Sequence, residues 1–171
     1  MDNNLDPQIS LIVYMMEDVR KVLLKGLEGL TKEEVNKPPL EGEMPIGKYL
    51  RHQALVDASW YNVITEGKDI NVDLIEKLKS LSWENGSSPD LDLNDYVKMM
   101  EDARKEVLEY IKTLKDSNLE EEIIREWQGK EYRLSKKWIL YHLIEHEAHH
   151  RGQMFLLLRK GGIRNKFELD V

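Results

Sequence analysis

The stretch SKKWILYHLIEHEAHHRGQMFLLLRKGG, residues 135–162, decides the fold, because it predicts one long amphipathic helix with both ends marked. Ser135 is a residue type that caps helix N-termini, and Gly161-Gly162 is typical of a helix end. Between them, apolar residues recur at steps of three and four, the spacing of one buried helix face. On a helical projection this face groups Ile139, Leu143, His146, His150, Gln153, Met154 and Leu157. We therefore predict a core-facing helix from Lys136 to about Lys160.

Two histidines lie in the middle of that face. His146 and His150 are four residues apart, so their imidazoles lie on the same side of the helix. A buried imidazole has two ring nitrogens that need partners, and a missing partner costs about 1–3 kcal/mol. A metal ion satisfies one nitrogen of each ring, whereas hydrogen-bonded core histidines are the alternative. The spacing favours a metal site for this pair, with His142 and His149 on one flank.

The fifth histidine supplies a third candidate ligand. His52 falls on the same face as Tyr49, Val56 and Trp60 in an earlier predicted helix, and we expect this face to be the core side. Three imidazoles with an open fourth position are typical of a catalytic rather than a structural zinc site. The sequence therefore predicts a divalent metal at His52, His146 and His150, while a core histidine without a metal is the alternative for His52.

Three more helices are predicted along the chain. They run from Pro7 to before Gly29, from Gly47 to near Gly67, and from Leu93 to Leu114. Residues 68–90 are ambiguous, with room for a short helix within 70–81, and residues 118–134 could form a small hairpin or a turn. Four long amphipathic helices in 171 residues predict an all-α four-helix bundle, with residues 1–171 as a single domain. The loops are long enough for crossover connections.

The composition limits the function. A formal net charge of −7 argues against a non-specific nucleic-acid binder, which would normally be basic. The absence of cysteine excludes disulfides, thiolate ligands and a cysteine nucleophile, so any thiol in a reaction comes from outside the chain. The acidic, polar first residues do not fit a signal peptide, and no apolar run approaches the roughly 18 residues of a membrane span. We expect a cytoplasmic protein with no nucleic-acid or membrane partner.

Residues 146–150 also satisfy H-E-x-x-H, the pattern with which zinc metalloproteases bind their metal and activate water. A peptidase would need Glu147 as its base. The downstream histidine of the metzincin pattern is absent, and little in the sequence suggests a substrate-binding sheet edge. We therefore predict that Glu147 lies on the helix surface or hydrogen-bonds a metal ligand, and we keep the peptidase as the weaker alternative.

Residues 138–153, WILYHLIEHEAHHRGQ, resemble the signature of the DinB-like (DNA-damage-inducible) superfamily, whose last helix carries an H-x-x-x-H-R-G-Q run. The early isolated histidine is also similar. The resemblance implies a four-helix bundle of the DinB-like type with an unusual crossover connection. It also implies one divalent metal, zinc first and nickel or iron as alternatives, held by the residues that are here His52, His146 and His150. His142 and His149 match no ligand position.

The resemblance implies a reaction class only broadly. Some relatives are S-transferases that use a low-molecular-weight thiol such as bacillithiol, and one branch is a mycothiol-dependent isomerase. The first hypothesis is thus a metal-dependent transferase that joins an external thiol to a small electrophilic substrate. The alternatives are a non-catalytic, stress-related bundle that the metal stabilises, and a metal-dependent hydrolase. The catalytic residues beyond the metal ligands are unknown at this point.

Side chains near the histidines suggest further roles. Trp60, Tyr49 and Met154 could line a substrate cavity, although such residues at helical spacing are usually plain core. Gly152 inside a helix suggests the close approach of a neighbouring helix. A second apolar set on the last helix indicates burial on two faces, either within the bundle or in a homodimer, which the superfamily often forms. This set is Leu140, Ile144, Phe155 and Leu158.

Overall fold

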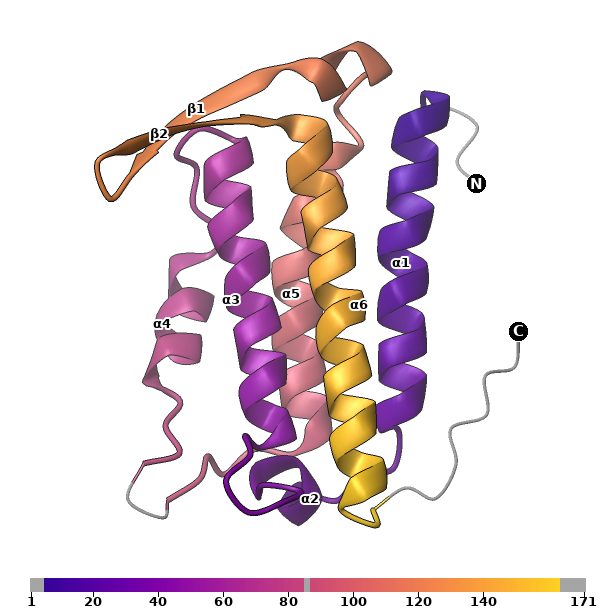
Figure 1. Cartoon of the computed structure of the whole chain (residues 1–171), viewed down its shortest axis with the longest axis vertical. Helices are drawn as coiled ribbons and strands as arrows, with labels where there is room; N and C mark the ends of the chain where they lie inside the picture. The colour runs from indigo at the N-terminus through magenta and orange to yellow at the C-terminus, as the bar shows by residue number, and fades with distance from the viewer. Residues whose placement is uncertain (1–4, 85–86, 164–171) are drawn as a thin grey trace.

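The computed structural model describes residues 5–84 and 87–163, which form a four-helix bundle (Figure 1). The long helices are α1 (Pro7–Leu27), α3 (Ile46–Ile64), α5 (Leu93–Ile111) and α6 (Lys136–Lys160). The shorter elements are α2 (Lys32–Asn36), α4 (Val72–Ser80), the 3-10 helix η1 (Asp116–Glu120), β1 (Glu122–Trp127) and β2 (Lys130–Ser135). The predicted bundle is confirmed. None of the described helices has the length and apolar character that a membrane span needs.

The connection from α3 to α5 is a crossover. Backbone amides in the first turn of α1 donate to the Asp116 carboxylate just after α5, at 3.1 Å from Gln8 and Ile9. At the opposite end, the Asn36 side chain donates to the Leu91 carbonyl just before α5, at 2.7 Å. Hence α1 and α5 are antiparallel, whereas α3 and α5 run in the same direction. The segment with α4 connects α3 to α5 and returns along the outer side of α3 (Figure 1). Helix α6 packs between α1 and α3. The crossover connection that the resemblance implied is confirmed.

The ends of the helices follow local sequence chemistry. The Ser135 hydroxyl accepts a hydrogen bond from the Trp138 amide at 3.2 Å, and Gly162 has a φ of +73° just after α6, so both predicted ends are confirmed. Helix α5 stops at Ile111 rather than at the predicted Leu114. The Leu114 amide bonds the Ile111 carbonyl at 3.0 Å in a tighter turn, which keeps the Leu114 side chain in the core although it has left the helix.

The ambiguous segment 118–134 contains an antiparallel β-hairpin. Strands β1 and β2 pair from Glu122 opposite Ser135 to Trp127 opposite Lys130. Gln128 and Gly129 connect them with φ values of +51° and +73°, the backbone of a tight two-residue turn. The hairpin projects across the end of the bundle where α3 stops and α6 starts (Figure 1). The short helix expected within 70–81 is α4. Of the ambiguous residues 68–90, Asn85 and Gly86 lie outside the described residues.

Four buried charged side chains, one from each long helix, form a charge quartet inside the bundle: Arg20, Asp57, Arg104 and Glu147. Arg104 donates to both Asp57 oxygens at 2.9 Å and to Glu147 at 2.7 Å. Arg20 donates to Glu147 at 2.6 and 3.2 Å and approaches Asp57 at 3.4 Å. Two cations thus meet two carboxylates, so the quartet carries no net charge, and the attraction between these ions offsets the cost of burying them.

Candidate metal centre

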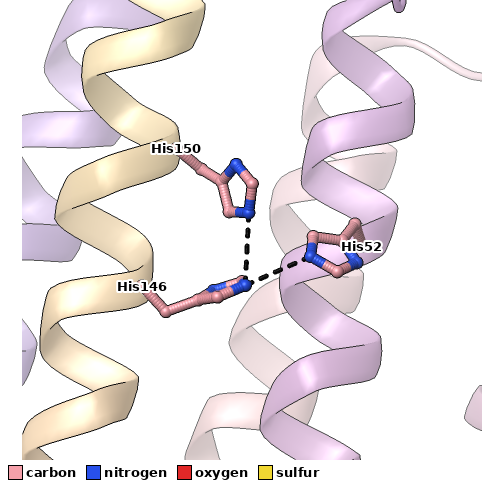
Figure 2. A group of neighbouring side chains, drawn as sticks. All are labelled: His52, His146 and His150. Carbon is pink, nitrogen blue, oxygen red and sulfur yellow. Dashed lines mark hydrogen bonds between the residues drawn. The ribbon is translucent and has the colours of Figure 1, made fainter.

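Helices α3 and α6 bring the three predicted ligands together (Figure 2). His52 projects from α3 toward His146 and His150, which lie one turn apart on α6 and whose rings meet edge to face. The Nε2 atom of His146 lies 3.1 Å from Nε2 of His52 and 3.2 Å from Nε2 of His150. One nitrogen from each ring lies within 4.8 Å of the others, so the three imidazoles could hold a metal ion.

The three histidines lie at the solvent edge of the bundle, which corrects the prediction that they face its core. His52 is exposed, and His146 and His150 are half-buried. The most buried face of α3 is instead formed by Leu50, Gln53, Ala54, Asp57 and Ala58. Because this face includes two polar residues, the apolar pattern of α3 pointed to the neighbouring face that contains His52. The centre is consequently open to molecules from solvent.

Burial and neighbouring charges favour the neutral form of His52 and His146. Burial above all, and then the neighbouring imidazoles of His150 and His52, lower the pKa of His146 to about 4. Burial, His150 and Arg51 lower the pKa of His52. An imidazole binds a metal ion only in its neutral form, so these shifts leave the nitrogen lone pairs available at neutral pH.

Gln153 orients one of the three rings. Its amide oxygen lies 2.7 Å from Nδ1 of His150, and its amide nitrogen lies 3.0 Å from Nε2 of His149. An amide oxygen only accepts, so Nδ1 of His150 carries the proton and Nε2 presents its lone pair to the cluster. His142, which matches no ligand position, stacks on Trp138 with ring centroids 5.1 Å apart and an interplanar angle of 3°.

The spacing of the nitrogens fits a tetrahedral metal. Zinc–imidazole bonds of about 2.0–2.1 Å place two tetrahedral ligands about 3.3 Å apart. The two measured Nε2 separations, 3.1 and 3.2 Å, are close to that value. In the described part of the chain the group contains no fourth histidine and no carboxylate, so three neutral nitrogens would leave one position free.

The carboxylate of the H-E-x-x-H pattern points away from this centre, which makes its predicted position wrong. Glu147 is 1% exposed and belongs to the charge quartet rather than to the helix surface. Burial raises the pKa of Glu147, but the attraction of Arg20 and Arg104 outweighs burial and leaves the pKa below its usual value. Because both Glu147 oxygens accept hydrogen bonds from arginines inside the bundle, this carboxylate is not available as the water-activating base of a peptidase at the three histidines.

Some of the roles predicted for other residues near the histidines agree with the structure, and others do not. Trp60 lines a cavity, Tyr49 packs against the His150 ring at 5.6 Å between centroids, and Met154 is plain core. Gly152 has no atom within 4 Å of the position of a Cβ, so the expected close helix contact is wrong. The second apolar set of α6 packs on the bundle core, with Leu140 and Leu158 fully buried and Ile144 and Phe155 partly so.

Comparisons with known proteins agree with this architecture. A sequence model of the DinB family matches residues 1–166. A conserved protein from Enterococcus faecalis has a similar structure, with a TM-score of 0.71, 14% identity, and coverage of 91% of this chain and 97% of that protein. YfiT from Bacillus subtilis, described as a probable metal-dependent hydrolase with an unusual four-helix bundle topology, has a TM-score of 0.65 and 15% identity, covering 95% and 92%.

A DinB-like protein from Bacillus cereus gives a TM-score of 0.52 at 20% identity, with 91% of both chains covered. No curated protein matches the chain. At these identities the structural similarities show the fold, whereas the family match extends over nearly the whole sequence and includes all three histidines. The chain belongs to the DinB family.

Proposed function

We propose that His52, His146 and His150 bind one divalent metal ion. The convergence of three ring nitrogens from α3 and α6 carries this proposal. Zinc suits three imidazoles and a free position, and nickel and iron accept the same donors. The ring of His150 is already oriented by Gln153, so little reorganisation is needed for that ligand.

The reaction that fits best is the transfer of a low-molecular-weight thiol to a small electrophilic substrate. When bound, the metal supplies a Lewis acid that holds a thiol in its reactive thiolate form. The chain has no cysteine, so the thiol is a second substrate from solvent, and the exposed edge at His52 gives it access. This reaction requires no carboxylate base at the centre, which agrees with the burial of Glu147 in the charge quartet.

The second candidate is a metal-dependent hydrolase. The description of YfiT, whose bundle is similar, favours this reaction. Both candidates use the same centre but differ in the nucleophile, which is an external thiol in one and water in the other. A third possibility, a bundle that the metal only stabilises, predicts a large loss of melting temperature on chelation and no turnover.

Metal analysis of protein purified without an affinity tag tests the centre. We expect one metal ion per chain in the wild type, loss of the metal in His52→Ala and His146→Ala, and retention in the matched control His149→Ala. Retention in His52→Ala would show that α3 supplies no ligand. Metal-loaded protein is then incubated with an alkyl halide, with and without bacillithiol. Consumption only with the thiol supports the transferase, and equal consumption without it supports the hydrolase.

The assembly and location of the protein are also proposals. We propose a homodimer in the cytoplasm that acts on small molecules. Light scattering measures the mass of the metal-loaded protein directly, and a mass of one chain, 20.1 kDa, would exclude the dimer.

A further inference from the structure

A cavity of about 630 Å³ lies between the end of α3, the β-hairpin and the start of α6, about two helical turns from the metal centre. This volume is in the range of sites that bind small molecules. We call it the hairpin cavity. Its lining includes Trp60, Arg125, Trp127, Tyr132 and Trp138.

Aromatic rings dominate the walls of the hairpin cavity. Trp60 and Trp138 meet edge to face, with centroids 5.7 Å apart, and Trp127 lies 6.3 Å from Tyr132 on the hairpin. Trp127 is 65% exposed and Trp138 is 42% exposed, so much of this aromatic surface is available to a ligand. Indole and phenol rings favour offset or edge contacts with another planar ring. The walls therefore suit a flat aromatic molecule.

A cation with unused hydrogen-bonding capacity lies among these rings. Arg125 stands opposite Tyr132 in the hairpin, and its Nη2 donates to the Asn62 and Val63 carbonyls of the last turn of α3, at 3.2 and 3.3 Å. Its Nε–H is buried and has no acceptor among the described residues, which also provide no carboxylate partner for Arg125. A ligand with an oxygen acceptor, a carboxylate above all, would complement this charge.

A row of ring contacts on α3 and α6 connects the hairpin cavity to the metal centre. On α6, Trp138, His142 and His146 follow each other at intervals of four residues, and the His142 ring lies 5.1 Å from Trp138 and 5.7 Å from His146. From the α3 side, Trp60 lies 5.2 Å from the same His142 ring. Eight residues separate Trp138 from His146, about 12 Å along the helix axis. A small molecule anchored at Trp60 can therefore extend past His142 to the histidine cluster.

We propose that the hairpin cavity binds the planar aromatic part of the substrate through ring contacts and an oxygen acceptor at Arg125, while the reactive group of the substrate lies at the metal centre. The location of the reactive group rests on the proposed function. Binding of the aromatic part uses only the cavity and needs no metal.

Calorimetric titration of metal-free protein with 2-naphthoate tests the cavity by itself. We expect saturable binding to the wild type, weakened about tenfold in Arg125→Met, which loses a charge-assisted hydrogen bond. Trp127→Ala should weaken binding about fivefold and leave the fold intact, because this side chain is largely exposed. The matched control is Tyr14→Ala, which removes a 51% exposed ring on α1 that does not line the cavity. Cyclohexanecarboxylate, which has the acid group but no flat ring, should bind at least fivefold more weakly than 2-naphthoate.

The outcomes separate this proposal from the proposed function. No saturable binding, or equal binding in Trp127→Ala, Arg125→Met and Tyr14→Ala, would overturn the cavity proposal even if the protein binds metal and is active. Selective weakening in Trp127→Ala and Arg125→Met supports it, even if metal analysis rejects the three-histidine centre. Circular dichroism and melting of each variant verify that the fold is unchanged, and if Arg125→Met does not fold, Trp127→Ala decides the result.

Discussion

Replacing Arg104 by methionine should destabilise the protein strongly, because it leaves a buried carboxylate without compensation. Asp57 is 1% exposed and would lose both of its 2.9 Å hydrogen bonds, keeping only the Arg20 contact at 3.4 Å. Glu147 would lose one bond at 2.7 Å but keep Arg20 at 2.6 Å. One unpaired carboxylate in a bundle core corresponds to a loss of about 3–5 kcal/mol, a large share of the roughly 5–15 kcal/mol that stabilises a typical domain.

Urea unfolding of metal-free protein, followed by far-UV circular dichroism, measures this loss. Lys98→Met is the matched control, since Lys98 forms a 3.2 Å ion pair with Asp102 on the surface, and it should lower the free energy of unfolding by less than about 1 kcal/mol. Adding Asp57→Asn to Arg104→Met restores the charge balance and should recover part of the stability. A loss in Arg104→Met no larger than in Lys98→Met would refute the reasoning, because a carboxylate left unpaired in the core would then carry no measurable cost.

Two further predictions concern glycines and acid. Gly47→Ala should lower the free energy of unfolding by about 1–3 kcal/mol, because the new Cβ would lie 2.7 Å from Cζ of the buried Tyr96 ring. Gly152→Ala should raise the free energy of unfolding by about 0.5–1 kcal/mol, because the position has room for a Cβ and alanine favours a helix. Thermal melting compares both variants with the wild type. A destabilised Gly152→Ala would contradict the open space at this position. In metal-free protein, stability should fall as the pH decreases from about 6.5 to about 4, since in that range the unfolded chain protonates His146, while the folded chain, with a pKa of about 4, does not. Urea titrations across this range should show a weaker dependence in His146→Asn, and an unchanged dependence would assign the acid sensitivity to other groups.

The sequence was most informative where local chemistry alone determines structure. Helix α6 could be bounded to the residue, because Ser135 and Gly162 act within their own turns. The pairing of His146 with His150 follows from helix geometry alone, so it too could be read directly. The existence of four long helices needed only the period of the apolar residues.

The orientation of α3 and the burial of Glu147 depend on partners from other helices, so they could not be predicted from local sequence. The buried side of α3 includes Asp57, whose burial makes sense only once Arg104 and Arg20 are known to meet it. The same partners explain why Glu147 turns inward although the H-E-x-x-H pattern suggests otherwise. An apolar projection of α3 therefore gave the wrong orientation of the helix, although it identified His52 as a member of the cluster.

The hairpin cavity could not be predicted from the sequence, for a different reason. Its aromatic walls come from a segment whose short alternating pattern did not distinguish a strand from a turn. Trp60 and Trp138 are 78 positions apart, and only the crossover topology places them on neighbouring helices.

The crossover also has a consequence for how the chain reaches this structure. Helix α1, the first in the chain, packs mainly on α6, the last. The main contacts of α1 therefore join the two ends of the chain. Contacts between distant segments require large loops to close before they yield any stabilisation, and folding slows as the mean separation of contacting residues increases. The protein should fold more slowly than an up-and-down helical bundle of the same length, and stopped-flow refolding against such a bundle would measure the difference.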